Sequence, residues 1–274
     1  MRRNGKKKSV VRKVVFFLLL LAAGFTAAQF VYPDVSKLRR ENPKKTAFME
    51  YREREWEREG KKYRINQRWA PYNAISPYLI KAVLIGEDDK FWSHEGFDYE
   101  AMQKAIEKDL KAKKFKLGGS TISQQLAKNL YLSPSKNPVR KIREAVITWR
   151  LERALSKKRI LEIYLNVAEW GDRGIFGIEA AARHYYGKPA SALGSEEAAR
   201  LASVLPNPRK FNPLGDQKYV VHRSGLIYNI MVKRGIAVPE FEEMQADKEA
   251  PEQPASSVPP SSPPPVERTQ PSSQ

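Results

Sequence analysis

The sequence predicts a mainly helical domain that follows one N-terminal transmembrane helix. Most of the chain from Ile75 to Lys233 repeats apolar residues every three or four positions, which is the period of an amphipathic helix. No stretch shows the apolar-polar alternation of a half-buried strand. Val14 to Val31 is an 18-residue run without a charge. As a helix it would extend about 27 Å, close to the hydrocarbon thickness of a bilayer.

We interpret this run as a retained membrane anchor. A cleaved signal peptide also joins a basic segment to an apolar one, but its apolar part is usually shorter. The segment from Gln29 to Pro33 offers no clear small-x-small cleavage site. Seven lysines and arginines precede the run. By the positive-inside rule, residues 1–13 form a cytoplasmic basic stub, residues 14–32 the anchor, and the remainder lies on the outer face of the membrane.

Three further regions differ in composition. Residues 33–67 are charged and aromatic, and they are predicted to form a juxtamembrane lobe or a short hairpin; the sequence leaves both open. Residues 68–245 suit one compact domain. Residues 246–274 are rich in proline and serine, with little apolar material to bury, and are predicted to be a disordered tail.

The charge excludes some classes of partner. The formal net charge is +18, and seven of these charges belong to the cytoplasmic stub. Nucleic acid is not a usual partner outside the membrane, so the remaining basic surface favours anionic lipid head groups or pyrophosphates. The chain has no cysteine, which excludes disulfides and thiolate metal sites.

The first two helices of the domain have clear start signals. Ser76 and Pro77 begin a helix that ends near Glu87. Asp98 can cap a second helix, whose apolar positions are Met102, Ala105, Ile106 and Leu110. The lysine-rich stretch that follows, residues 110–117, leads to a glycine break at residues 118–119 and is a candidate membrane-facing flap.

The later helices follow the same reasoning. Ser120 or Thr121 caps a third helix, and Asn137-Pro138 opens a fourth. In the fourth helix Ile142, Val146 and Trp149 are predicted to face the core. Further helices are predicted over residues 158–166, 178–186, 195–205 and 218–233, each ended by glycine, proline or a loss of period.

Two groups of charged residues could carry chemistry. Glu87 ends an apolar helix, where partial desolvation raises the pKa of a carboxylate towards that of a general base. Without other support, an acidic residue in this position is more commonly solvated surface. Arg140 and Glu144 share a face of the fourth helix, with Lys141 beside them, and a surface ion pair is the plainer interpretation.

The start of the third helix is a third candidate. The N-terminus of a helix attracts anions, although a flexible glycine joint with an ordinary cap explains the same residues. The polar residues of this segment, with the glycine before them, are Gly119, Ser120, Thr121, Gln124, Gln125, Lys128 and Asn129.

Four motifs occur in order along the chain: Glu-Asp-x-x-Phe-x-x-His-x-Gly at 87–96, Gly-Gly-Ser-Thr-Ile-x-Gln-Gln-x-x-Lys-Asn at 118–129, Arg-Lys-x-x-Glu at 140–144 and Ile-Leu-x-x-Tyr-Leu-Asn at 160–166. They closely resemble the motifs of glycosyltransferase family 51, the peptidoglycan glycosyltransferases. With a piece from Glu197 to Pro213 that is similar to the family's last motif, the resemblance covers residues 68–215. The anchor, the short domain and Arg68–Tyr72 are most similar to the monofunctional biosynthetic transglycosylase branch. Gly86 departs from the alanine or serine expected before the glutamate.

The resemblance implies a lysozyme-like helical glycosyltransferase domain that joins lipid II units into β-1,4-linked glycan with inversion and release of undecaprenyl pyrophosphate. It implies that Glu87 is the base that deprotonates the 4-hydroxyl of the acceptor sugar. Pyrophosphate leaves as a stable anion, so it needs charge neutralisation more than a proton. Lys128, Arg140 and Lys141 are therefore its candidate ligands, with Mg²⁺ or Mn²⁺ as an additional one. No tightly bound cofactor is expected.

Glu144 completes the catalytic pair implied by the resemblance. Cations on either side stabilise its ionised form, which makes it a poor general acid, so we expect it to orient Arg140 and Lys141. The candidates for positioning phosphate or sugar are Gly119, Ser120, Thr121, Gln124, Gln125 and Asn129.

Tyr164 and Asn166 are predicted to brace the cleft, and His94 to make a structural hydrogen bond. The expected partners are lipid II, the growing glycan chain, the membrane, and cell-wall synthesis and division proteins, with no nucleic acid. The expected location is the bacterial inner membrane, in a single pass with the N-terminus in the cytoplasm.

Two other functions are weighed against this one. A lysozyme-like glycan hydrolase could use a carboxylate on such a fold, but it has no pyrophosphate for the cations to hold. A non-catalytic membrane scaffold for wall-synthesis proteins would not need Glu87.

Overall fold

The computed structural model describes residues 12–18, 20, 24, 33–112, 119–134 and 138–238 of the chain. Residues 12–18, 20 and 24 are helical, but most of the predicted anchor at 14–32 lies outside the described residues. Within the described part, no helix is both long and apolar enough to cross a bilayer. The predicted tail at 246–274, residues 113–117 of the predicted flap and Gly118 of the glycine break also lie outside it.

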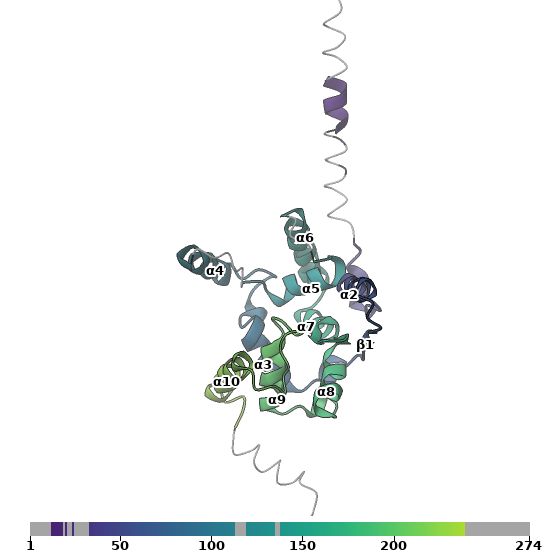
Figure 1. Cartoon of the computed structure of the whole chain (residues 1–274). Coiled ribbons are helices and arrows are strands. Elements are labelled where there is room, and N and C mark those ends of the chain that lie inside the picture. Colours follow the sequence, from purple (N-terminus) through teal and green to yellow (C-terminus); the bar gives the residue numbers. More distant parts are fainter. Residues whose placement is uncertain are drawn as a thin grey trace, which may run out of the picture. The chain divides into compact units, whose positions relative to one another are not determined.

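The domain is mainly helical, as predicted, and its elements are labelled in Figure 1. In chain order they are η1 (Ser36–Arg39), α2 (Ala47–Arg58), β1 (Asn66–Gln67), η2 (Tyr72–Ala74), α3 (Pro77–Glu87), η3 (Phe91–Ser93), α4 (Tyr99–Ala112), α5 (Ile122–Tyr131), α6 (Pro138–Ala154), α7 (Lys157–Val167), β2 (Glu169–Gly171), β3 (Ile175–Phe176), α8 (Ile178–Tyr186), η4 (Ala190–Ala192), α9 (Ser195–Val204) and α10 (Lys218–Lys233).

The predicted helix ends are confirmed within a residue or two. Helix α3 begins directly after Ser76, with Pro77 at its first position. The Ser76 hydroxyl does not cap the helix; it donates to the carbonyl of Leu193 at 2.7 Å and so ties the start of α3 to the residue after η4. Asp98 caps α4, since its Oδ1 accepts from the Ala101 amide at 2.9 Å. Helix α8 ends at Gly187, which has the left-handed φ of 69° that a glycine adopts without strain.

Residues 33–67 are not a separate juxtamembrane lobe. Helix α2 within this segment buries Met49 and Trp56 in the same hydrophobic core as the rest of the domain. Arg52 on α2 donates to Glu169 at the start of β2, with Nη2 2.7 Å from Oε2. The folded domain therefore begins before the predicted boundary at residue 68, because α2 contributes buried apolar side chains to its core.

The alternative of a short hairpin for this segment is also wrong. Asn66–Gln67 pairs in parallel with Ile175–Phe176, far along the chain, and Glu169–Gly171 adds an antiparallel partner to make a small sheet of order β1-β3-β2. Strands of two or three residues are too short to show alternation, so the sequence predicted no sheet.

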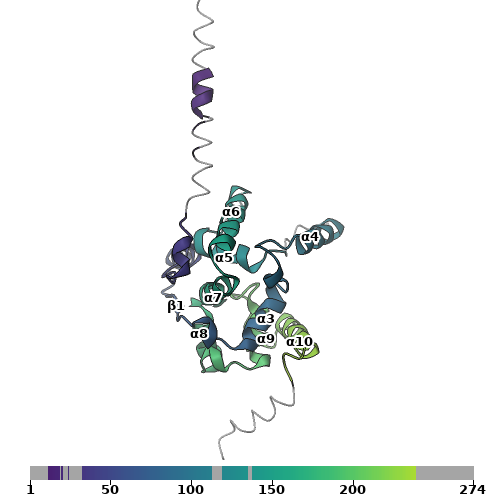
Figure 2. The ribbon, with the colours of Figure 1, turned by 180° about the vertical axis from the view of Figure 1, so that it is seen from behind.

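The core of the domain is formed around α5, α7 and α9, in which most residues are buried. Every residue from Leu165 to Val167 in α7 is buried, and α5 buries Ile122, Leu126 and Leu130 as predicted. Helices α3, α9 and α10 pack against one another, and they lie together in both views of the chain (Figures 1 and 2). This packing brings the end of α3 beside α10.

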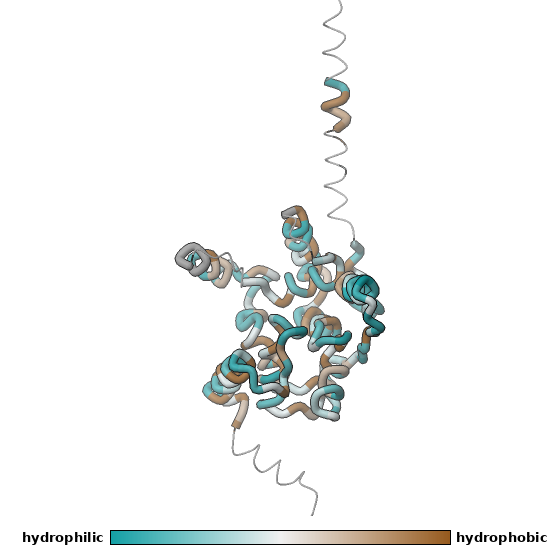
Figure 3. Tube along the Cα trace, viewed as in Figure 1, coloured by the Kyte–Doolittle hydropathy of each residue, from teal (hydrophilic) through white to brown (hydrophobic). Residues whose placement is uncertain are grey.

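The predicted inward face of α6 is wrong. Ile142 is 66% exposed and Trp149 is 44% exposed, whereas Ile147 and Leu151 are buried. Apolar residues occur on more than one side of this helix, and apolar and polar turns are mixed along its length (Figure 3). Their period therefore did not decide which side would be covered. The buried side carries Glu144, which places this carboxylate inside the protein.

Candidate active site

Glu87 lies at the end of the apolar helix α3, beside the polar side chains of Gln125 and Arg223. Leu79 and Val83 are completely buried along the helix. The Glu87 side chain is 10% exposed. Burial raises the pKa of Glu87, and this effect exceeds the opposite effects of a hydrogen bond from Gln125 and of the charges on Arg223 and Lys128. The direction agrees with the one expected for a carboxylate at an apolar rim.

Gln125 on α5 contacts Glu87 directly. Its Nε2 donates to Oε2 of Glu87 at 2.9 Å, and its Oε1 accepts from the hydroxyl of Tyr164 at 3.0 Å. Tyr164 is buried in α7, so its hydroxyl fixes which end of the amide faces the carboxylate. The predicted bracing role of Tyr164 is consistent with this contact. Gln125, predicted to position substrate, holds the candidate base.

Asn166 braces the other side of α7. Its Nδ2 donates to the carbonyls of Ala70 and Glu162, both at 2.8 Å, and its Oδ1 accepts from the Ala70 amide at 2.7 Å. All of these contacts are within the protein, which agrees with the predicted structural role.

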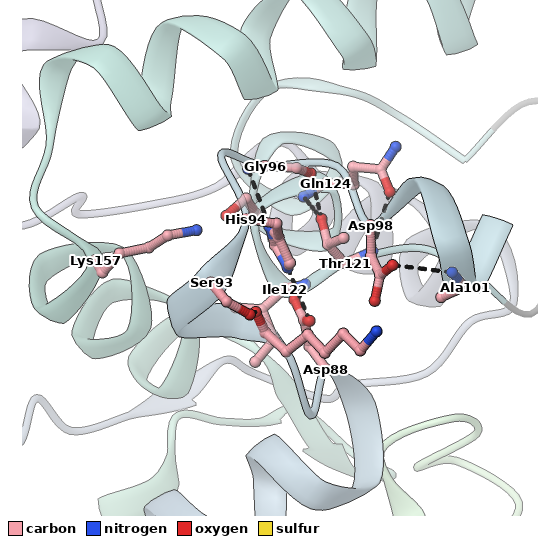
Figure 4. Close-up of polar contacts among 12 residues, drawn as sticks. Asp88, Ser93, His94, Gly96, Asp98, Ala101, Thr121, Ile122, Gln124 and Lys157 are labelled. Carbon is pink, nitrogen blue, oxygen red and sulfur yellow. Dashed lines mark hydrogen bonds and ion pairs between the residues drawn. The ribbon is translucent and has the colours of Figure 1, made fainter.

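Asp88 joins the end of α3 to the start of α5 (Figure 4). Its Oδ2 accepts from the Ile122 amide at 2.9 Å, and its Oδ1 lies 2.9 Å from Nε2 of His94. The Gly96 amide donates to Nδ1 of His94 at 3.1 Å, so Nε2 carries the proton that is shared with Asp88. His94 therefore makes the structural hydrogen bond expected of it. Asp88, which follows Glu87 in the chain, thereby links the end of α3 to α5, the helix that carries Gln125.

We expect Asp88→Ala to lower the free energy of unfolding by about 2–4 kcal/mol, because it removes two buried hydrogen bonds to a carboxylate. Asp89→Ala is the matched control. Asp89 is the adjacent residue, and it pairs with Arg234 where both side chains are about half exposed. Such a pair is worth about 0–1 kcal/mol. Thermal unfolding of the two variants measures the difference. An equal loss in both would contradict the role of Asp88 as the link between α3 and α5.

Thr121 and Gln124 form the N-terminal cap of α5. Oγ1 of Thr121 accepts from the Gln124 amide at 3.2 Å, and Oε1 of Gln124 accepts from the Thr121 amide at 3.0 Å. The Thr121 hydroxyl also donates to the carbonyl of Gly96 at 2.7 Å (Figure 4). Both residues are buried. The Thr121 hydroxyl and Oε1 of Gln124 therefore have a structural role at the start of α5, and the substrate contacts that the sequence predicts for the two residues stay predictions.

Three other residues of this segment surround the cap. Gly119 lies against α4, since a Cβ on it would be 3.4 Å from Cβ of Ala105. Ser120 is half-buried and Asn129 is buried. Substrate contacts for these three residues stay predictions.

Glu144 is the centre of a cationic cluster that consists of Lys128, Arg140 and Lys141. Its Oε2 accepts from Nη1 of Arg140 at 2.8 Å, and its Oε1 pairs with Nζ of Lys141. The Glu144 side chain is 4% exposed. The interpretation of these residues as a surface ion pair is therefore wrong for Glu144, although Lys141 itself is 48% exposed.

Lys128 connects this cluster to Glu87. Desolvation lowers the pKa of Lys128, the charges of Arg140 and Lys141 lower it further, and those of Glu144 and Glu87 partly compensate. The ammonium group of Lys128 therefore interacts electrostatically with both Glu87 and Glu144, the predicted catalytic pair. Lys128, Arg140 and Lys141 thus place three cations around the carboxylate of Glu144. A site of this kind is stabilised by a bound anion.

The carboxylates of the site do not form a donor set for a metal ion. Both oxygens of Glu144 face cations, and those of Glu87 face Gln125 and Arg223. Nor do the described residues contain any group of three His, Asp or Glu side chains placed to hold a metal.

Sequence reasoning missed Arg223 on α10. Its Nη2 donates to the carbonyl of Gly86 at 2.7 Å and lies 3.4 Å from Oε1 of Glu87, 136 residues away in the chain. The sequence did contain a signal for its role: Arg223 lies on the same side of the predicted helix as the apolar residues Val220 and Ile227, which are buried. Gly86 also has an explanation here, since a Cβ on it would be 3.3 Å from Cδ1 of Ile227. The glycine lets α3 and α10 approach closely.

Comparison with known proteins identifies the family of this chain. Residues 54–232 match the family model described as transglycosylase. A biosynthetic peptidoglycan transglycosylase of Nitrosospira multiformis is 50% identical over 195 residues, which cover 71% of this chain and 84% of the relative. Relatives of the same name from Dechloromonas aromatica and Azoarcus sp. are 54% identical over 62% of this chain and 74% of theirs, and 53% identical over 66% and 78%. The family match and these identities show that the chain belongs to the transglycosylase family, as its ordered motifs indicated.

Proposed function

We propose that this transglycosylase polymerises lipid II into the glycan strands of peptidoglycan, with Glu87 as the base and the cationic cluster as the receptor for the pyrophosphate leaving group. The observation that carries the proposal is that a buried carboxylate of raised pKa, Glu87, lies next to the cationic cluster around Glu144. The first suits the removal of a proton from a hydroxyl, and the second suits a departing anion.

The reaction follows from this division of tasks. The Glu87 carboxylate takes the proton of the acceptor 4-hydroxyl as the sugar oxygen forms a bond to the anomeric carbon of the donor chain. The bond from that carbon to the lipid pyrophosphate breaks, and its electron pair leaves with the phosphate oxygen. Attack from the side opposite the leaving group inverts the anomeric carbon and gives a β-1,4 linkage. Glu87 ends the step protonated.

The cationic cluster acts on the leaving group. Lys128, Arg140 and Lys141 would bind the pyrophosphate oxygens, and Glu144 would hold Arg140 and Lys141 in position for them. Desolvation and neighbouring cations lower the pKa of Lys128, and an arriving pyrophosphate would oppose this effect and stabilise the charged ammonium group. Mg²⁺ or Mn²⁺ would have to be held mainly by the pyrophosphate itself, and no step of the mechanism depends on it.

The test against a glycan hydrolase is the choice of substrate. Purified protein is incubated with labelled lipid II and, separately, with finished glycan strands. We expect consumption of lipid II with the appearance of polymer, and no shortening of the glycan. If the finished glycan is cleaved and lipid II is left intact, the proposed function is wrong.

We expect Gln125→Glu to reduce polymerisation at neutral pH by at least about tenfold. The new carboxylate would lie where Nε2 of Gln125 is now 2.9 Å from Glu87, and two carboxylates at that separation raise the pKa of one of them strongly. The ionised base would then be lost at higher pH than in the wild type. The pH profile of kcat should show its acidic limb moved upward. Gln103→Glu is the control, since it makes the same change at an exposed position, where Gln103 donates to Glu107. Its acidic limb should stay in place.

We place the enzyme in the bacterial inner membrane, with residues 1–13 in the cytoplasm, residues 14–32 as a single anchor and the catalytic domain on the periplasmic face. Support comes from the uncharged run at 14–31 and the seven cations before it. Protease added to spheroplasts should digest the domain and spare the N-terminal stub. Protection of the domain would exclude this topology.

A further inference from the structure

We propose that Arg223 is a positioning residue for Glu87, which it holds from α10 through both the backbone and the carboxylate of the residue. The inference rests on the proposed role of Glu87 as the base. It assigns to α10 a part in catalysis that none of the four motifs used to recognise the family contains.

The backbone contact is made where α3 needs a partner. The last carbonyls of a helix have no amide within the helix to accept from. Gly86 is the last residue but one of α3, and its carbonyl accepts from Nη2 of Arg223 at 2.7 Å. A charged donor on this carbonyl stabilises the turn that carries Glu87 and suits the negative end of the helix dipole. The absence of a side chain on Gly86 allows α10 to come close enough for this contact.

The Glu87 carboxylate is contacted from two helices, α10 and α5. Nη2 of Arg223 is 3.4 Å from Oε1 of Glu87, and Nε2 of Gln125 donates to Oε2 at 2.9 Å. One oxygen is thus held from α10 and the other from α5, which fixes the plane of the carboxylate. Each carboxylate oxygen has two lone pairs, so an acceptor hydroxyl can still be bound.

The arginine is held in this position at a cost. Nε of Arg223 is buried, and it has no hydrogen-bond partner in the described part of the chain. Leaving a buried donor unsatisfied destabilises the folded state. A residue selected only to join two helices could use a fully satisfied or an apolar contact instead, as Ile227 does one turn later. The unsatisfied Nε is offset by the contacts that Arg223 makes with Gly86 and Glu87 at the end of α3.

The charged and titratable groups that face Glu87 come from three helices: Lys128 from α5, Tyr164 from α7 and Arg223 from α10, together with the neighbouring Asp88. Burial raises the pKa of Glu87, and both the charge and the hydrogen bond of Arg223 lower it. Removal of Arg223 should therefore raise this pKa further, and the base should be lost at a higher pH.

The experiment compares Arg223→Gln and Arg223→Lys in the full-length enzyme with lipid II as substrate. For Arg223→Gln we expect kcat to fall roughly tenfold to a hundredfold, because a misplaced base costs that much. The KM for lipid II should change less than about threefold, and the acidic limb of kcat should move upward by roughly one pH unit. Arg223→Lys keeps the charge and loses the planar fork, so its kcat should fall while its limb moves less.

Arg234→Gln is the matched control. Arg234 follows the last turn of α10 and pairs with the exposed Asp89, just beyond the end of α3, without contacting Glu87. The kcat of Arg234→Gln should stay within about twofold of the wild type, with the acidic limb at the same pH.

Three outcomes would overturn the proposal: Arg223→Gln is folded and has an unchanged kcat and acidic limb, its loss of activity is confined to KM, or Arg234→Gln loses as much activity. Should Arg223→Gln not fold, an unchanged kcat in Arg223→Lys would overturn it. An active Glu87→Gln enzyme would instead reject the proposed role of the base.

Discussion

Glu87→Gln is expected to reduce lipid II polymerisation by roughly a hundredfold to ten-thousandfold, the range that a positioned general base contributes. Glutamine has the size of glutamate but cannot take the proton of the acceptor hydroxyl. The protein should stay folded, because burial already disfavours the charge on this side chain and raises its pKa. Initial rates with fluorescent lipid II measure the first effect, and thermal unfolding measures the second.

The control for Glu87→Gln is Glu59→Gln, which removes an exposed carboxylate that pairs with Lys61. It should leave the rate unchanged. A scaffold without catalysis predicts another result: cells that depend on this protein would grow equally well with Glu87→Gln and with the wild type. Normal growth together with normal polymer would refute the assignment of Glu87 as the base.

Glu144→Ala is expected to lower both activity and stability. Glu144 provides the one carboxylate among Lys128, Arg140 and Lys141, and its side chain is 4% exposed. Without it the three cations repel one another, and nothing holds Arg140 and Lys141 towards the leaving group. We expect kcat to fall at least about tenfold. The free energy of unfolding should fall by about 1–3 kcal/mol, less than for a fully buried pair because Lys141 is half exposed.

The matched control for Glu144→Ala is Glu50→Ala. Glu50 and Arg54 have the same four-residue spacing as Arg140 and Glu144, but both of their side chains are more than half exposed. Such a pair contributes about 0.3–0.5 kcal/mol. Chemical denaturation and steady-state rates of both variants decide the matter. If Glu144→Ala is as mild as Glu50→Ala, the cluster is an ordinary ion-pair group and does not serve the leaving group.

The helices were predictable because their signals are local. Ser76-Pro77 before α3, Asp98 before α4 and Gly187 after α8 act within a few residues of the helix ends that they determine. The buried face of α6 was not predictable in this way. Its apolar residues lie on more than one side, and contact with the rest of the domain selected the side of Ile147 and Leu151.

The small sheet and the role of residues 33–67 were missed for a related reason. Asn66–Gln67 becomes a strand only because Ile175–Phe176 lies beside it. A two-residue segment carries no local signal that predicts pairing with a segment more than a hundred positions away. Likewise, Trp56 and Met49 on a highly charged helix gave little indication that α2 completes the core.

The sequence by itself determined the helical class, most helix ends, the family, and the residues that became the two centres of the site, Glu87 and Glu144. It could do so because spacing within a helix and the order of motifs are properties of the chain. Only the tertiary structure decided what each candidate contacts. It assigned Thr121 and Gln124 to a cap, turned Gln125 and Arg223 towards Glu87, and buried Glu144. These contacts join residues 38 and 136 positions apart for Gln125 and Arg223, and they exist only after packing has brought α5 and α10 to the end of α3.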